Sequence, residues 1–188
     1  MLYISLGGNC SITYHLIENN LREKAYPFDW CKISIKQLIN ILEKDFDNFV
    51  DTIELKKISY HHPSNSTDYS IILNNIYNIT FAHEIISIFE IDDFKNMLNR
   101  RIKRFKNIND YVIFIRIELE PIKENYYNSI MKLINLLNKY CKNYILKLIL
   151  NTDINFKFPE NIQIYKFNCF SSDWKINNID WKNILVIY

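Results

Sequence analysis

The chain has 188 residues, of which 48% are hydrophobic and 23% charged, a composition that supports a large apolar core and excludes a disordered chain. The formal net charge is only +2, so a nucleic-acid partner bound through its phosphates is not expected. No apolar run approaches the roughly 20 residues of a membrane-spanning helix, and we expect no secretory leader and no membrane partner. We expect a cytoplasmic protein, in the host cytoplasm if its source is a virus.

In the first half of the chain, residues 2–6 are an apolar run that predicts a buried strand, and Gly7 and Gly8 predict a turn after it. Apolar residues at helical spacing then predict a helix over 10–21, which Asn9 or Ser11 can cap. The remaining expectations are an aromatic loop over 25–30, a helix over 35–49, a loop-like stretch over 51–70, and short strands over 69–73 and 76–81.

The second half of the chain alternates helices with apolar strands more clearly. Expected are helices over 91–107 and 122–141, and strands over 111–117, 144–150, 162–167 and 184–188. Apolar strands between helices are typical of a mainly parallel sheet with helices on both faces, as in flavodoxin-like or esterase-like three-layer folds. The chain is therefore predicted to form a single α/β domain over residues 1–188, with an irregular segment near 51–80.

In such a sheet, chemistry is found beyond the carboxyl ends of the strands. This rule selects the segment from Gly7 to Cys10 after the first strand, and Arg116 near the end of the strand over 111–117. It also selects the polar residues from Asn151 to Asp153, which follow the strand over 144–150.

Cys10 follows the two glycines of the chain after one intervening residue, Asn9, at the predicted start of a helix. The unpaired N–H groups of a helix N-terminus carry partial positive charge, which favours a thiolate and lowers the pKa of a cysteine. The N–H groups near Gly8, Asn9 and Cys10 can also hold a developing oxyanion. The alternative is a small buried cysteine that helps the helix to pack. The other cysteines are interpreted as structural: Cys31, Cys141 and Cys169.

A cysteine nucleophile needs a base. His83 follows a short apolar strand, and a strand end can direct an imidazole at a distant site; the alternative is a structural histidine. His15 is five positions after Cys10, which is about 140° around a helix, so we interpret it as a packing or surface residue. The cysteines and histidines lack the spacing of zinc ligands, and neither a metal nor an organic cofactor is expected.

Several other charged residues have two interpretations each. Asp29 lies between aromatic residues and either caps a loop or orients another group. Arg116 interrupts a buried strand and needs a partner; it either binds an anionic substrate or pairs with Glu118 or Asp29. Arg100 and Arg104 are one helical turn apart and form either an anion clamp or a solvated face.

Five motifs together resemble one family. They are Ser-Leu-Gly-Gly-Asn-Cys over 5–10, Ala-Tyr-Pro-Phe-Asp-Trp over 25–30, Phe-Ala-His-Glu over 81–84, Arg-Arg-Ile-Lys-Arg-Phe over 100–105 and Ile-Phe-Ile-Arg over 113–116. In this order they are similar to a largely uncharacterised family, found in bacteria and large DNA viruses, that is labelled papain-like cysteine peptidases. The resemblance covers about residues 3–117 and offers a papain-like α+β fold as the alternative architecture.

The resemblance implies that Cys10 is the nucleophile and His83 the general base. The family usually has an aspartate where this chain has Glu84, and its motifs do not fix the third member of a triad. Asp29 is the first choice, because it belongs to the Phe-Asp-Trp motif. Asn151 or Asp153 would instead fit the order of cysteine, histidine and Asn/Asp in papain-like enzymes.

The leading hypothesis is therefore a cysteine-dependent hydrolase or acyl transferase that acts on a peptide, acyl or small anionic substrate. The residues expected on the substrate side are Gly8, Asn9, Arg100, Arg104 and Arg116. One alternative is a non-catalytic α/β module that holds a phosphate- or sugar-nucleotide-type ligand at the helix N-terminus. A second alternative is a viral interaction protein with a degenerate site.

Overall fold

The computed structural model describes residues 1–62, 65–81, 91–119, 125–151, 156–167 and 173–185, and only the backbone within 55–71. The helices are α1 (Ser11–Glu18), α2 (Ile35–Glu43), α3 (Ile91–Lys106), α4 (Tyr126–Tyr140) and α5 (Trp181–Leu185). The strands are β1 (Leu2–Ser5), β2 (Cys31–Lys32), β3 (Ile53–His62), β4 (Asn65–Asn74), β5 (Ile79–Phe81), β6 (Val112–Glu118), β7 (Tyr144–Leu150) and β8 (Ile162–Lys166). None of the described helices is long and apolar enough to cross a bilayer.

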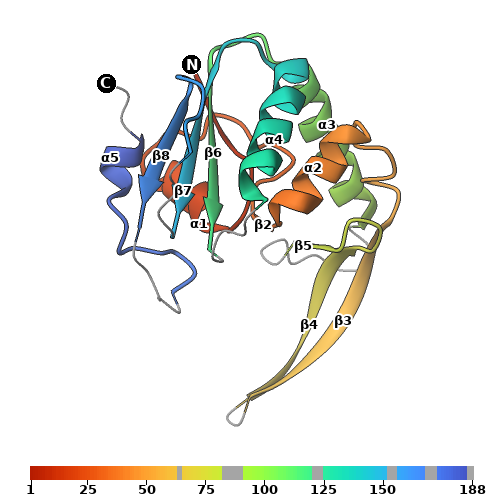
Figure 1. The fold of residues 1–188 in the computed structure, drawn as a ribbon. Helices are drawn as coiled ribbons and strands as arrows, with labels where there is room; N and C mark the ends of the chain where they lie inside the picture. The colour runs from red at the N-terminus through yellow and green to blue at the C-terminus, as the bar shows by residue number, and fades with distance from the viewer. Residues whose placement is uncertain (63–64, 82–90, 120–124, 152–155, 168–172, 186–188) are drawn as a thin grey trace.

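Strands β1, β6, β7 and β8 form a parallel sheet of four strands in that order (Figure 1). The register places Ile4 opposite Phe114, Phe114 opposite Leu146, and Leu146 opposite Ile162. Strands β1, β6 and β7 are almost wholly buried, because a parallel sheet is covered on both faces. The expected α/β class is confirmed.

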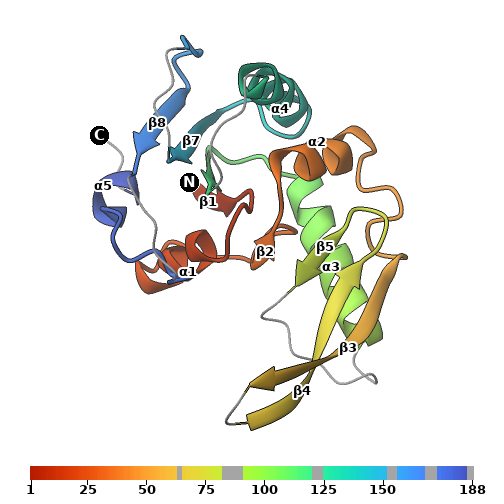
Figure 2. The same ribbon diagram turned by 60° about the horizontal axis from the view of Figure 1, so that its bottom comes forward.

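The two faces of this sheet belong to two apolar clusters, because successive side chains of a strand point to opposite sides. Ile4 and Phe114 pack with α2, α3 and α4 in the larger cluster. Tyr3 and Ile115 pack with α1 and α5 in the smaller one. Figure 2 shows α1 and α5 on one side of the sheet and α2 and α4 on the other. Helices on both faces are thus confirmed as expected.

A second sheet is antiparallel, with the strand order β2, β5, β4, β3. Its β3 and β4 form a long hairpin that leaves the body of the protein (Figures 1 and 2). The loop expected over 51–70 is therefore wrong. Among the described strands, β4 pairs with β5 only over Ile72–Asn74, and farther out it pairs only with β3. The sequence of this stretch lacks the regular apolar alternation by which strands are recognised, and its polar residues are typical of a loop.

Two helical expectations also need correction. The helix expected over 35–49 ends at Glu43, because Asp45, Phe46 and Asn48 adopt positive φ; Phe46 still reaches the core. The strand expected over 184–188 is wrong where the chain is described, since Ile184 lies in α5. A short apolar run fits a buried helix as well as a strand, and the carboxylate of Asp180 accepts the N–H of Asn183 at the helix start.

Candidate nucleophile site

The turn between β1 and α1 requires both glycines. Gly7 and Gly8 have φ of +73° and +96°, in the left-handed region that glycine tolerates. A Cβ on Gly7 would lie 2.3 Å from Cγ2 of Ile33, and one on Gly8 would lie 2.0 Å from the carbonyl oxygen of Ile117 in β6. The turn predicted at these glycines is confirmed, and both also allow a close approach of the backbone to its neighbours. The turn packs against the carboxyl end of β6, and Cys10 follows two residues later.

Cys10 is the N-cap residue of α1 and is 7% exposed. Its thiol donates a hydrogen bond to the carbonyl oxygen of Trp30 at 3.4 Å. The side-chain oxygen of Asn9 accepts the N–H of Ser11 at 2.8 Å, so Asn9 caps the helix start. Within the described residues, the N–H groups of Gly8 and Asn9 have no hydrogen-bond acceptor, and the backbone of Cys10 itself hydrogen-bonds its own thiol. These N–H groups therefore remain available beside the sulfur.

Burial raises the pKa of the Cys10 thiol to about 11, and the nearby backbone and the positive charge of Lys32 lower this pKa by less. The expectation of a lowered pKa is thus wrong for the surroundings that the structure describes, because desolvation of the sulfur outweighs the field of the helix N-terminus. A thiolate at neutral pH needs an additional base. His83, which we expected in that role, lies outside the described residues.

Asp29 holds the aromatic loop in place. Its side chain is 2% exposed, and one carboxylate oxygen accepts hydrogen bonds from Nε of Arg22 at 2.9 Å and from the N–H of Tyr26 at 3.0 Å. Burial raises the pKa of Asp29, and Arg22 opposes that rise. These contacts are those of the loop cap, one of the two interpretations of Asp29. Trp30, the next residue, has φ of +59°, so Asp29 helps to position the carbonyl that the thiol contacts.

Two side chains hold the aromatic loop beside Cys10, and the sequence analysis did not single out either of them. The N–H of Trp30 donates to the hydroxyl oxygen of Thr13 at 3.3 Å, and Arg22 reaches Asp29 from the segment after α1. A backbone carbonyl such as that of Trp30 has no signal in a sequence. Thr13 did have a signal in the sequence, because it lies three residues after Cys10 and so on the same side of α1.

Arg116 is completely buried and its donors point to three different acceptors. Nε contacts the carboxylate of Glu118 at 2.6 Å, and the two terminal nitrogens donate to the carbonyls of Leu6 at 2.9 Å and Ile33 at 3.1 Å. Of the two interpretations, these contacts fit the structural pairing. The guanidinium fastens the ends of β1 and β6 to the loop before α2, behind the glycine turn.

Arg100 and Arg104 differ in their surroundings. Arg100 is exposed, whereas Arg104 is half-buried and donates to the carbonyl of Ala25. The guanidinium carbon of Arg104 lies 6.0 Å from the ring centroid of Tyr26. Arg104 therefore attaches the aromatic loop to α3, and of this pair only Arg100 is exposed to an incoming ligand.

His15 is a packing residue, as expected. Its Nε2 hydrogen-bonds the carbonyl of Lys175 at 2.8 Å, and its ring stacks on Trp181 with centroids 4.2 Å apart. Burial lowers the pKa of His15. These contacts fasten the segment before α5 to the outer side of α1.

The candidates for the third member of a triad are only partly described. Asn151 follows β7 and donates to the carbonyl of Leu119, which ties the carboxyl ends of β6 and β7 together. Glu84 and Asp153 lie outside the described residues, as does Cys169.

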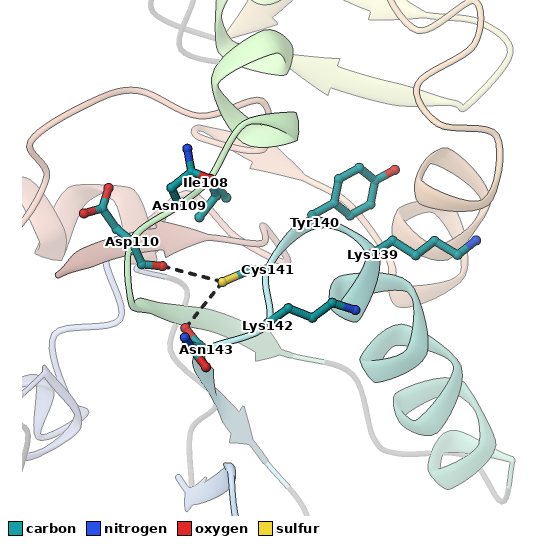
Figure 3. A pocket seen from close by; sticks show the side chains of 8 residues that line it. All are labelled: Ile108, Asn109, Asp110, Lys139, Tyr140, Cys141, Lys142 and Asn143. Atoms are coloured by element: carbon teal, nitrogen blue, oxygen red, sulfur yellow. Dashed lines mark hydrogen bonds between the residues drawn. The ribbon is translucent and has the colours of Figure 1, made fainter.

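Two pockets lie near the amino ends of β6 and β7, at the opposite end of these strands from Cys10. One has a volume of about 200 Å³ and surrounds Cys141, whose thiol donates to the carbonyls of Asp110 at 3.7 Å and Asn143 at 3.4 Å (Figure 3). An adjoining pocket of about 310 Å³ shares Tyr140. Burial raises the pKa of Cys141, and Cys31 is likewise buried against a carbonyl; both fit the structural interpretation. In the described ranges no three His, Cys, Asp or Glu side chains gather as metal ligands.

A parallel strand, a glycine turn and a cysteine at the following helix start define the class: an α/β protein with a candidate nucleophile at the carboxyl edge of its sheet. Residues 1–157 match the family described as "Putative papain-like cysteine peptidase (DUF1796)", and the chain belongs to that family. The chain is also similar to a protein of Acanthamoeba polyphaga mimivirus named "Uncharacterized protein R408". The two are 29% identical over 218 residues, which cover 98% of this chain and 97% of that protein. The expected family is confirmed.

Proposed function

We propose that this protein is a cysteine-dependent hydrolase or acyl transferase that acts on peptides, with Cys10 as its nucleophile. The observation that carries the proposal is the position of Cys10: it begins α1 directly beyond the carboxyl edge of the sheet, among N–H groups with no acceptor in the described residues. The family description supplies the reaction class and the peptide as substrate.

His83 is the proposed base, and the path of the chain supports it. Strand β5 ends at Phe81, whose register partner is Cys31. Cys31 directly follows Trp30, whose carbonyl accepts the Cys10 thiol. The chain therefore enters residues 82–90 beside the nucleophile loop, and two residues of chain reach roughly 7 Å.

In the proposed reaction, His83 takes the thiol proton and the sulfur of Cys10 attacks the substrate carbonyl carbon. The N–H groups from Gly8 to Cys10 hold the negative oxygen that forms. The C–N bond then breaks, the imidazolium returns its proton to the leaving amine, and the acyl group remains on sulfur. Water or a second amine attacks this thioester and releases the acyl group. Asp29 acts as a positioning residue, through the loop that carries Trp30.

The first test is the pH dependence of Cys10 alkylation by iodoacetamide, followed by peptide mapping. With a histidine base, the wild-type thiol reacts already at pH 6–7. The His83→Ala variant then reacts appreciably only as the pH rises toward the value of about 11 that burial alone sets. Cys10→Ala removes the labelled peptide, whereas Cys141→Ala serves as the matched control and keeps it. Identical profiles for wild type and His83→Ala, both rising only toward pH 11, would refute the catalytic assignment.

A second candidate function is a non-catalytic module that binds a phosphate- or sugar-nucleotide-type ligand at the start of α1. The N–H groups of Gly8 and Asn9 favour it, because they have no acceptor among the described residues and can donate to a phosphate oxygen. Calorimetric titration with uridine diphosphate distinguishes the two functions. Binding that persists in Cys10→Ala, together with a thiol that is unreactive at neutral pH, would select the binding module.

A further inference from the structure

Three aromatic side chains gather beside Cys10, and we call Tyr14, Trp30 and Trp174 the aromatic patch. The ring centroids of Trp30 and Trp174 are 6.4 Å apart, and those of Tyr14 and Trp174 are 5.5 Å apart. Trp174 is 40% exposed, and the other two rings are half-buried. Each ring of the patch therefore keeps part of its apolar surface open to solvent instead of burying all of it in the core.

The patch is directly connected to the nucleophile. The thiol of Cys10 contacts the backbone carbonyl of Trp30 at 3.4 Å, so one residue of the patch is in direct contact with the nucleophile. Tyr14 lies one helical turn after Cys10, and its N–H donates to the Cys10 carbonyl at 3.1 Å. Two of the three residues of the patch are therefore joined to Cys10 through their backbone, one across the loop and one along α1.

The third ring is brought there by a segment far away in the sequence. Trp174 precedes α5, and Figure 2 shows this segment passing along α1. The hydrogen bond from His15 to the Lys175 carbonyl and the stack of His15 on Trp181 fix that segment. The patch is consequently a fixed surface of the folded protein, and its rings lie at set angles to each other.

We propose that the aromatic patch binds the aromatic side chain of a peptide substrate, next to the carbonyl that Cys10 attacks; this inference rests on the proposed function. Trp174 is inclined by 56° to Trp30 and by 73° to Tyr14. Rings inclined in this way present both faces and edges, and a further flat ring is attracted to both arrangements. A small side chain such as alanine covers little of this surface.

A positive charge beside the patch further restricts which substrate side chains can bind there. The ammonium group of Lys175 lies 4.7 Å from the ring centroid of Tyr14 and 5.7 Å from that of Trp174. Lys32 also acts on Cys10 with its positive charge. A substrate with lysine or arginine at this position would meet the like charge of Lys175, so the subsite selects an aromatic and rejects a basic side chain.

The test measures the rate at which Cys10 of the full chain is modified by three peptidyl acyloxymethyl ketones. These probes differ only in the residue whose carbonyl Cys10 attacks, which is Phe, Ala or Lys. The wild type should react about tenfold faster with the Phe probe than with the Ala probe, and slowest with the Lys probe. Trp174→Ala should bring the ratio of Phe to Ala rates close to one, and Trp174→Phe should largely restore it.

Two controls separate the subsite from the nucleophile. Tyr111→Ala removes a ring that is 43% exposed at the other edge of the sheet and should leave the ratio unchanged. The rate with iodoacetamide should be the same in wild type and Trp174→Ala. A wild-type ratio near one, or a high ratio that survives in Trp174→Ala, overturns the subsite while the proposed function stands. A thiol that iodoacetamide does not modify at neutral pH overturns both.

Discussion

At the scale of single residues, the glycine turn is where one methyl group matters most. Gly8→Ala would place a Cβ 2.0 Å from the backbone oxygen of Ile117 at a φ of +96°. Backbone cannot move aside cheaply, and the left-handed conformation costs a further 1–2 kcal/mol or so. We expect the free energy of unfolding to fall by at least about 2 kcal/mol, measured by urea denaturation.

Gly7→Ala is the matched comparison, because its clash is with a side chain. The Cβ would meet Cγ2 of Ile33 at 2.3 Å, and Ile33→Ala removes that atom. The cost of Gly7→Ala should therefore be smaller in the Ile33→Ala background than in wild type. No such rescue is expected for Gly8→Ala. If the stability losses of Gly7→Ala and Ile33→Ala simply add in the double mutant, the contact with Cγ2 of Ile33 is not the source of the Gly7→Ala cost.

Arg116 supports a second prediction at this scale. Removing one partner of a buried ion pair leaves the other charge uncompensated, so Arg116→Ala should cost about 3–5 kcal/mol of folding stability. Arg100→Ala, at an exposed position of α3, should change stability by less than about 0.5 kcal/mol. Urea denaturation measures both. A stable Arg116→Ala protein with weakened binding of anionic substrates would instead assign Arg116 to the substrate.

The candidate site shows how far single residues can be predicted. The position of Cys10 at a helix start follows from local sequence, because a strand, two glycines and helical spacing determine it. Its pKa does not follow, since the burial that desolvates the sulfur depends on tertiary packing, as does the contact of the thiol with the Trp30 carbonyl 20 positions away in sequence. Likewise, Arg116 had to have a buried partner, but only the fold identifies Glu118 and two backbone carbonyls as its acceptors.

At the scale of elements, local periodicity decided which expectations succeeded. Strand β7 spans Tyr144–Leu150 and α3 spans Ile91–Lys106, close to the expected ranges, because a long apolar run and a clear helical stripe each allow one solution. The sequences of the β3–β4 hairpin and of α5 were each compatible with more than one conformation. In both, pairing or packing with distant parts of the chain determines the conformation, and a local pattern does not contain that information.

The start of α2 offers a prediction about an element as a whole. Ser34 and Gln37 form a capping box, and Nε2 of Gln37 also donates to the carbonyl of Asn78 at 2.7 Å, just before β5. Ser34→Ala should lower the stability by about 1 kcal/mol. Ser129→Ala within α4 removes a half-buried hydroxyl whose one printed contact is a long hydrogen bond of 3.4 Å to the carbonyl of Asn125, and it should cost less than about 0.5 kcal/mol. Equal effects in thermal melts would mean that the capping box contributes nothing.

At the scale of the whole molecule, the distal part of the long hairpin differs from its base, where Ile53 and Ile72 lie in the core. Residues 56–71 pair only within the hairpin, as far as the structure describes them, and Lys56 lies opposite Ile71. Replacing residues 57–70 by Asn-Gly should keep the register, because this dipeptide favours a two-residue hairpin turn. We expect the melting temperature to change by less than about 4 °C and Cys10 alkylation to be unchanged. Loss of a cooperative melt would show that the distal hairpin stabilises the body.

The attachment of the segment before α5 to α1 should make the stability of the whole molecule depend on pH. Burial lowers the pKa of His15 in the folded state, whereas the unfolded chain keeps a value near 6.5. As the pH falls through about 6.5, the unfolded state therefore binds a proton that the folded state does not, and stability decreases until the pH reaches the folded pKa. The slope contributed by His15 is at most about 1.4 kcal/mol per pH unit.

His15→Gln isolates this contribution, because the other histidines and the buried Asp29 titrate in both proteins and cancel in the difference. Urea denaturation from pH 8 to pH 5 should give a difference in unfolding free energy that is constant above pH 7. Below about pH 6.5 the wild type should lose the larger share of its stability, since only it carries the buried imidazole. A difference that stays constant across the whole range would mean that protonated His15 keeps its place against Trp181 and Lys175.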